Sequence, residues 1–174
     1  MADVHRSFLQ AGADAITTNS YGVVPGVGFS TSEIETHVAT AGRIARQVAN
    51  EYNSGSKKFV FGSLGPLVES YRPDKIMEAQ EGTQVYTKMA AALAPFVDVW
   101  IAETMSCVEE SSQAIAAVGQ LNEEQQKPML VSYTLNSQGQ LRNGESATSA
   151  VTKTLDVCRE NQVECKCVCG FLLF

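Results

Sequence analysis

Apolar residues recur along the chain in two patterns, short runs of strand length and longer stretches with helical spacing. Five short runs predict strands, at residues 15–19, 59–61, 98–104, 129–135 and 163–174. Five stretches with apolar residues three or four positions apart predict helices, at residues 3–10, 34–52, 85–96, 108–121 and 147–158. Helices and strands therefore alternate through short connections, which is typical of β-α-β units around a parallel sheet.

Two α/β architectures fit this alternation, an open doubly wound sheet and part of a closed barrel. A complete (β/α)8 barrel typically needs about 250 residues. This chain has 174 residues, so a barrel would have to be incomplete. Neither a repeat of fixed period nor a long linker divides the sequence, and we expect one domain over residues 1–174.

The predicted strand at residues 98–104 ends in a carboxylate. Its Val, Trp and Ile residues predict a strand buried on both faces, and Glu103 comes at its carboxyl end. Ligands of α/β proteins bind outside the carboxyl ends of the strands, so Glu103 is a candidate binding residue. The alternative is a solvated loop acid, and position alone does not separate the two.

A glycine-rich segment, Gly62-Ser63-Leu64-Gly65-Pro66, directly follows the predicted strand at residues 59–61. Two glycines and a proline in five residues predict a tight turn with exposed backbone N–H groups. Such a turn either binds a carboxylate or only changes the direction of the chain. Both histidines, His5 and His37, lie in helical stretches beside polar residues, which favours surface or capping roles over metal binding.

Charge and composition exclude several classes of function. The net charge is −6, and Lys and Arg are scattered rather than clustered, which argues against a surface for nucleic acid or anionic membranes. We therefore expect a small-molecule or protein partner. No apolar stretch approaches the roughly 20 residues that span a bilayer, and the first residues lack the apolar core of a secretory signal. Five cysteines fit reduced thiols, and these features together predict a cytoplasmic protein.

Four motifs, in order and at matching spacing, resemble the homocysteine S-methyltransferase family over roughly residues 2–163. They are Val4-His5-Arg6 together with Ala11 to Tyr21, Gly62 to Pro66, Glu103-Thr104 after an apolar strand, and Ser132-Tyr133-Thr134. The homocysteine-binding domain of this family is a (β/α)8 TIM barrel. The resemblance thus implies an α/β fold that forms part of a barrel, roughly strands two to six with their helices.

The resemblance also implies an activity, methyl transfer from S-methylmethionine, a similar sulfonium donor or a betaine-like donor to homocysteine, giving methionine. Only a thiolate attacks a methyl carbon, and a thiol with a pKa of about 8.5 is mostly protonated at neutral pH. Family members activate homocysteine with zinc held by three cysteines, which leaves one position for the substrate sulfur. Glu103 matches the family glutamate that binds the substrate ammonium group. The same comparison implies substrate-binding roles, with strand-end capping or turn formation as the alternative, for Asn19, Tyr21, Ser63 and Gly65, and a substrate-binding role for Thr134.

The sequence also departs from the family pattern. No counterpart of the first family strand precedes Met1, and nothing matches strands seven and eight or the cysteine pair after strand eight. Cys169 is the best positional match to the remaining zinc ligand. We therefore expect a domain truncated at both ends, with little or no activity from these 174 residues alone.

Cys165, Cys167 and Cys169 alternate along one predicted strand, so their side chains share a face. Successive Cβ atoms on one face are about 7 Å apart, too far for adjacent sulfurs to share one zinc unless the strand bends, and core thiols are the expected state.

Three hypotheses follow. The first is a zinc-dependent methyltransferase represented by its middle part. The second is an inactive family member without the zinc site, acting at most as a binding or interaction protein, for which open sheet edges predict self-association. The third is an unrelated small α/β binding domain. Whether the Glu103 and Ser63 loops face one pocket distinguishes it from the other two.

Overall fold

A computed structural model describes the backbone of residues 1–52 and 55–172 and the side chains of residues 1–52 and 55–166. The strands in this part of the chain are β1 (Ala15–Thr17), β2 (Phe59–Leu64), β3 (Val99–Met105), β4 (Met129–Leu135) and β5 (Cys165–Leu172). The helices are α1 (Ala2–Gln10), α2 (Thr31–Glu51), α3 (Ala79–Leu93), α4 (Val108–Gly119) and α5 (Ala147–Glu160), with short 3-10 helices η1 (Pro25–Val27) and η2 (Ala94–Phe96). Of these described helices, none has the length and apolar character needed to cross a membrane.

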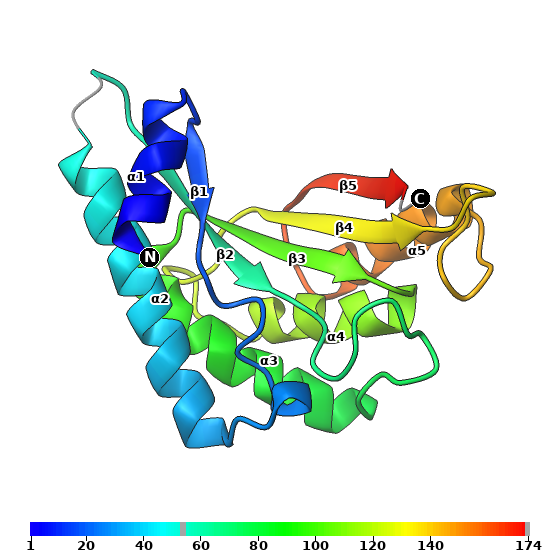
Figure 1. Ribbon diagram of the computed structural model, residues 1–174. Helices are drawn as coiled ribbons and strands as arrows, with labels where there is room; N and C mark the ends of the chain where they lie inside the picture. Colours follow the sequence, from blue (N-terminus) through cyan, green and yellow to red (C-terminus); the bar gives the residue numbers. More distant parts are fainter. Residues whose placement is uncertain (53–54, 173–174) are drawn as a thin grey trace.

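The five strands form one parallel sheet in the order β1-β2-β3-β4-β5, which is also their order in the chain (Figure 1). Helices α2 to α5 lie on the same face of this sheet, and α1 packs beside α2 near the edge strand β1 (Figure 1). Consecutive strands as neighbours with helices on one face form a barrel wall, whereas a doubly wound sheet carries helices on both faces. The partial-barrel prediction is therefore confirmed, and the doubly wound alternative is wrong.

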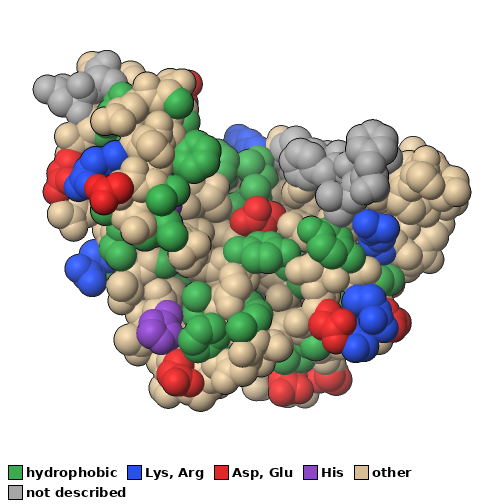
Figure 2. All heavy atoms as spheres, in the orientation of Figure 1, with side chains coloured by type: hydrophobic (Ala, Val, Ile, Leu, Met, Phe, Trp, Pro, Cys, Tyr) green, Lys and Arg blue, Asp and Glu red, His purple; other side chains and the backbone are tan. Residues whose placement is uncertain are grey.

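The two faces of the sheet differ in burial. Trp100 and Ala102 of β3 point toward the helices and are fully buried. On the other face, Val99, Ile101 and Glu103 are only half-buried. The prediction of a strand buried on both faces is thus wrong for the described residues, because no helix in that part of the chain covers the second face. Figure 2 shows the molecule hollowed between α1 and β4, with apolar and acidic side chains in the hollow.

Two strand boundaries differ from the prediction. β1 ends at Thr17 rather than Asn19, because the Thr18 side chain, not a backbone carbonyl, accepts the hydrogen bond from the backbone N–H of Ser63. β2 continues to Leu64, because its Gly62 and Ser63 pair with β3. The turn predicted at Gly62 therefore begins only after Leu64, and Ser63 belongs to a strand.

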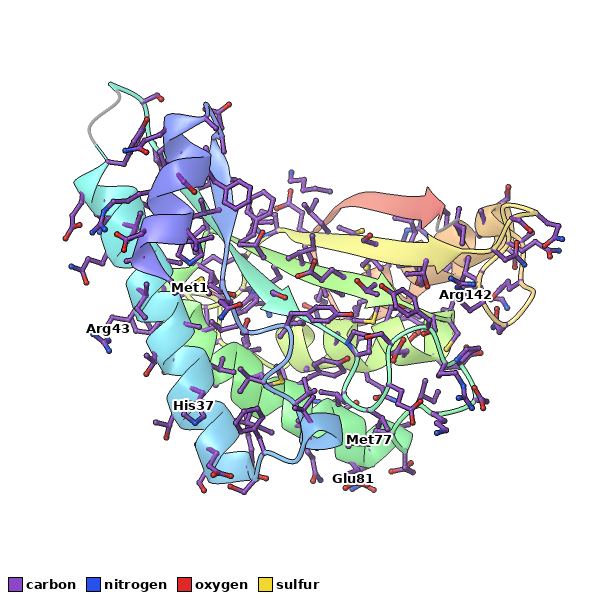
Figure 3. All side chains as sticks on the ribbon, viewed as in Figure 1. Met1, His37, Arg43, Met77, Glu81 and Arg142 are labelled. Carbon is purple, nitrogen blue, oxygen red and sulfur yellow. The ribbon has the colours of Figure 1, made fainter. Side chains whose placement is uncertain are left out.

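The two histidines lie in different environments. His5 of α1 is only 5% exposed, so the surface prediction is wrong for this residue. Burial, and then the charge of the nearby N-terminus, lower the pKa of His5. His37 lies exposed on α2, as predicted, and its ring packs edge-on against Phe29 with 5.4 Å between ring centroids (Figure 3).

Candidate functional site

Ser63 and Glu103 meet at the carboxyl ends of β2 and β3. The register pairs Ser63 with Ile101, which brings the Ser63 side chain next to that of Glu103. The Ser63 hydroxyl donates a hydrogen bond to Oε1 of Glu103 at 2.5 Å. Ser63 is fully buried and Glu103 is half-buried. Among the described residues, no group donates to Oε2 of Glu103, which leaves that oxygen open to a cationic ligand.

Two hydroxyl side chains after β1 fix the backbone of Ser63. The backbone N–H of Ser63 donates to Oγ1 of Thr18 at 3.0 Å, and the hydroxyl of Ser20 donates to the Ser63 carbonyl at 2.8 Å. The hydroxyl of Ser20 has one hydrogen, which it donates to that carbonyl. The Thr18 hydroxyl is therefore the donor in the 2.9 Å contact between Thr18 and Ser20. The loop after β1 thereby fixes the position of Ser63, and Ser63 in turn holds the Glu103 carboxylate.

The backbone of β3 is irregular at Glu103. An extra residue lies between Ala102 and Met105 relative to β4, which makes a β-bulge. Thr104 within it has a φ of 65°, a left-handed conformation that β-branched residues rarely adopt. Such a conformation costs about 1–3 kcal/mol and persists only where the surroundings impose it. Bulges next to functional sites redirect side chains, and this one sets the direction of Glu103.

The remaining predicted site residues are spread around this pair. Thr134 of β4 is buried and donates from Oγ1 to the Met105 carbonyl at 3.3 Å, so it supports the bulge rather than touching the carboxylate. Asn19 is exposed and lines a separate cavity of about 340 Å³ beside α1. The structure therefore joins Ser63 and Glu103 directly, whereas Thr134 and Asn19 lie apart from the carboxylate.

Tyr21 and Gly65 pack against each other in the loops after β1 and β2. A Cβ atom on Gly65 would lie 2.7 Å from Cδ2 of Tyr21, so only glycine allows this contact. The hydroxyl of Tyr21 lies 2.7 Å from the hydroxyl of Ser70. Tyr21 and Gly65, both predicted site residues, thus connect the loop after β1 to the loop after β2.

A second contact joins loops farther along the sheet. Arg142, in the loop after β4, lies over the ring of Tyr71, in the loop after β2, with 5.6 Å from its Cζ atom to the ring centroid (Figure 3). A cation–π contact that is partly exposed, as this one is, contributes about 0.5–1 kcal/mol. Because β3 lies between β2 and β4 in the sheet, this contact joins the loops on either side of the strand that carries Glu103.

Two buried polar residues that sequence analysis missed support the loops from the helix side. The hydroxyl of Tyr86, on α3, donates to the Gly65 carbonyl at 2.8 Å. The carboxylate of Glu110, on α4, accepts from the backbone N–H of Ser106 at 2.8 Å. Burial raises the pKa of Glu110 against the opposing effect of the Ser106 hydrogen bonds. Burial, and then the charge of Glu110, raise the pKa of Tyr86.

The cysteines with described side chains do not form a metal centre. Cys107 is buried at the start of α4, and Cys158 of α5 forms a hydrogen bond with Cys165 of β5. Within the described part of the chain, no three His, Cys, Asp or Glu side chains lie close enough to hold a metal ion. The backbone of Cys169 pairs with Ser132 in the sheet, but its side chain lies outside the described residues, as does that of Cys167.

The fold and the strand-end pair define the class of protein, an α/β protein built as part of a TIM barrel with a carboxylate and a hydroxyl at the carboxyl ends of its strands. A family model described as homocysteine S-methyltransferase matches residues 1–168. The chain belongs to the homocysteine S-methyltransferase family. This assignment excludes the hypothesis of an unrelated α/β domain.

Two solved structures share this fold. The chain resembles the metallated form of the homocysteine methyltransferase MmuM from Escherichia coli, with 16% identity and a TM-score of 0.71 over 97% of this chain and 79% of that chain. It resembles the oxidized form of the same protein with 13% identity and a TM-score of 0.60 over the same shares of the two chains. At these identities the likeness establishes the fold alone. The family is zinc-dependent, and the side chains described in this protein do not provide the three donors that such a site needs.

Proposed function

We propose that the protein binds homocysteine, with Glu103 as the partner of the substrate ammonium group, and acts in methyl transfer to the homocysteine thiol. The hydrogen bond between Ser63 and Glu103 at 2.5 Å carries this proposal. It holds one carboxylate oxygen in place at a strand end, while the other oxygen faces no donor among the described residues. In a family that acts on homocysteine, a half-buried carboxylate in this setting fits an ammonium group.

The proposed reaction takes a methyl group from a sulfonium donor such as S-methylmethionine. The homocysteine thiol releases its proton to water, and the resulting thiolate sulfur forms the new bond to the methyl carbon. The bond from that carbon to the donor sulfur breaks, and the donor leaves as a neutral thioether. Both products are methionine when S-methylmethionine is the donor.

Binding of homocysteine is the first test, by calorimetry on the full chain. The unmodified protein should prefer homocysteine over the analogue that lacks the amino group. Glu103→Gln should weaken homocysteine binding by about 10- to 100-fold, the equivalent of a charged hydrogen bond of about 1.5–3 kcal/mol, and should remove this preference. Glu109→Gln, at an exposed acid of α4, is the matched control and should bind as the unmodified protein does. Equal affinity of the unmodified protein for both compounds would contradict the role of Glu103.

A second candidate is a family member that binds homocysteine without transferring a methyl group. The lack of a three-donor cluster among the described side chains favours it. A methyl-transfer assay separates the two candidates, with S-methylmethionine labelled in its methyl group, homocysteine, and zinc either added or omitted. Labelled methionine supports the transferase, and binding without labelled methionine supports the second candidate.

A further inference from the structure

A buried acid on the helix side of the sheet holds the chain next to the bulge that carries Glu103. Glu110 lies in the first turn of α4, is only 3% exposed, and accepts the backbone N–H of Ser106 at 2.8 Å. Ser106 follows the bulge directly, two residues after the left-handed Thr104. The carboxylate of Glu110 therefore fixes the chain at the point where β3 turns into α4.

Glu33 offers a comparison within the same molecule. It occupies the same third position in α2 that Glu110 occupies in α4, and it also accepts a backbone N–H near the start of its helix, from Ser30 at 2.9 Å. Glu33 is exposed, as expected for an acid that only caps a helix. Burying a carboxylate costs free energy that helix capping alone does not require, which sets Glu110 apart.

The surroundings of Glu110 form a polar layer between α3 and α4. Gln113, one turn after Glu110, is buried and donates to the carbonyl of Met77, which lies just before α3 (Figure 3). Its amide oxygen packs so closely on Gly82 that a Cβ there would lie 1.9 Å away. Tyr86, on the same helix α3, holds the Gly65 carbonyl in the loop after β2. The neighbouring helices α3 and α4 thus each place a buried polar side chain on the backbone next to the site. Tyr86 binds the chain just after Ser63, and Glu110 binds it just after Glu103.

We propose that Glu110 is a positioning residue, which directs the carboxylate of Glu103 toward the ligand by fixing Ser106 and, through it, the strained bulge at Thr104. The inference rests on the proposed binding of homocysteine at Glu103. Besides the pairing of Met105 with β4, two hydrogen bonds from side chains act on the same segment, from Ser63 to Glu103 and from Thr134 to the Met105 carbonyl. Glu110 adds a hydrogen bond to this segment from the helix layer.

The test compares Glu110→Ala, Glu110→Gln and Glu33→Ala in the full chain. Hydrogen exchange, read by mass spectrometry, should be about 10-fold faster or more in the peptide spanning residues 103–107 of Glu110→Ala, relative to other β3 and α4 peptides. Homocysteine should bind about 10-fold more weakly, because displacement of a binding group by a fraction of an ångström is costly.

Two variants separate positioning from general stability. Glu110→Gln keeps an oxygen that accepts the Ser106 N–H, so it should restore homocysteine affinity to within about 3-fold of the unmodified protein. Glu33→Ala removes a capping acid and should lower Tm without changing homocysteine affinity or exchange at residues 103–107. A Glu110→Ala protein with unchanged exchange there, or with faster exchange and unchanged affinity, overturns the proposal. If the unmodified protein does not bind homocysteine, the proposed function fails, and the exchange rates alone then decide whether Glu110 fixes the bulge.

Discussion

Replacing Ser63 by Ala should weaken the link between β2 and β3 by a measurable amount. The buried Ser63 hydroxyl donates to the Glu103 carboxylate at 2.5 Å, and hydrogen bonds to charged groups contribute about 1.5–3 kcal/mol. Because Glu103 is half-buried, water replaces part of the lost bond, and the lower end of that range applies. A loss of about 1.5 kcal/mol in the free energy of unfolding corresponds to a fall of roughly 3–6 °C in Tm for a chain of this size.

The assay is urea unfolding followed by tryptophan fluorescence. Trp100 is the only tryptophan in the sequence and is fully buried in β3, beside Gly62 of β2, so its emission reports on the strand pair directly. A double-mutant cycle with Ser63→Ala, Glu103→Gln and both together isolates the bond between the two side chains.

The expected coupling energy is about 1 kcal/mol, and a value below about 0.3 kcal/mol would refute the reasoning. Ser112→Ala is the control, because the Ser112 hydroxyl donates only to the Val108 carbonyl of its own helix. That substitution should change stability by less than about 0.5 kcal/mol.

Three further predictions concern other parts of the molecule. Tyr133→Phe should lower the free energy of unfolding by about 1–2 kcal/mol, because its buried hydroxyl lies 2.6 Å from both Ser111 and Thr154; an unchanged urea midpoint would contradict this. Burial raises the pKa of Asp98, but hydrogen bonds from Arg46, Lys57 and the Val60 N–H outweigh it and hold this pKa below its usual value. The resulting stability is present above about pH 4 and lost as the pH falls, so the gap in free energy of unfolding between the unmodified protein and Asp98→Asn should close toward about pH 2, and a pH-independent gap would count against this. Burial raises the pKa of Cys107 to about 12, so iodoacetamide at about pH 8 should alkylate it far more slowly in the folded protein than in urea, as followed by peptide mass, and equal rates would show that the thiol is accessible.

The main features of the sheet could be predicted from the sequence because they depend on local patterns. Val, Trp and Ile before Glu103 mark a strand, and neighbouring parallel strands bring their carboxyl ends together, which is why Ser63 and Glu103 lie in contact. The register was not predictable, since Gly62 and Ser63 resemble a turn until β3 pairs with them. Burial of both faces of β3 was predicted wrongly, because the run 98–104 carries no information on what covers each face.

The residues that support the site could not be recognised in advance. Glu110 has the sequence position of an ordinary capping acid, and only the packing of α3 on α4 buries it. His5 has polar neighbours in the sequence, yet it shares with Leu9 the face of α1 that packs on the core. Thr18 and Ser20 lie in a motif that resembles the family, but their hydrogen bonds to Ser63 connect positions more than forty residues apart.

The order of the strands has a consequence for how the protein folds during synthesis. Each strand of the described sheet pairs with the strand made just before it, so the partner of every new strand already exists when that strand leaves the ribosome. Pairing between successive strands keeps the sequence separation of these contacts smaller than pairing between distant strands would, and a smaller separation favours faster folding. The contact between Ser63 and Glu103 joins β2 and β3, so both residues of this pair are synthesised before α4 and α5.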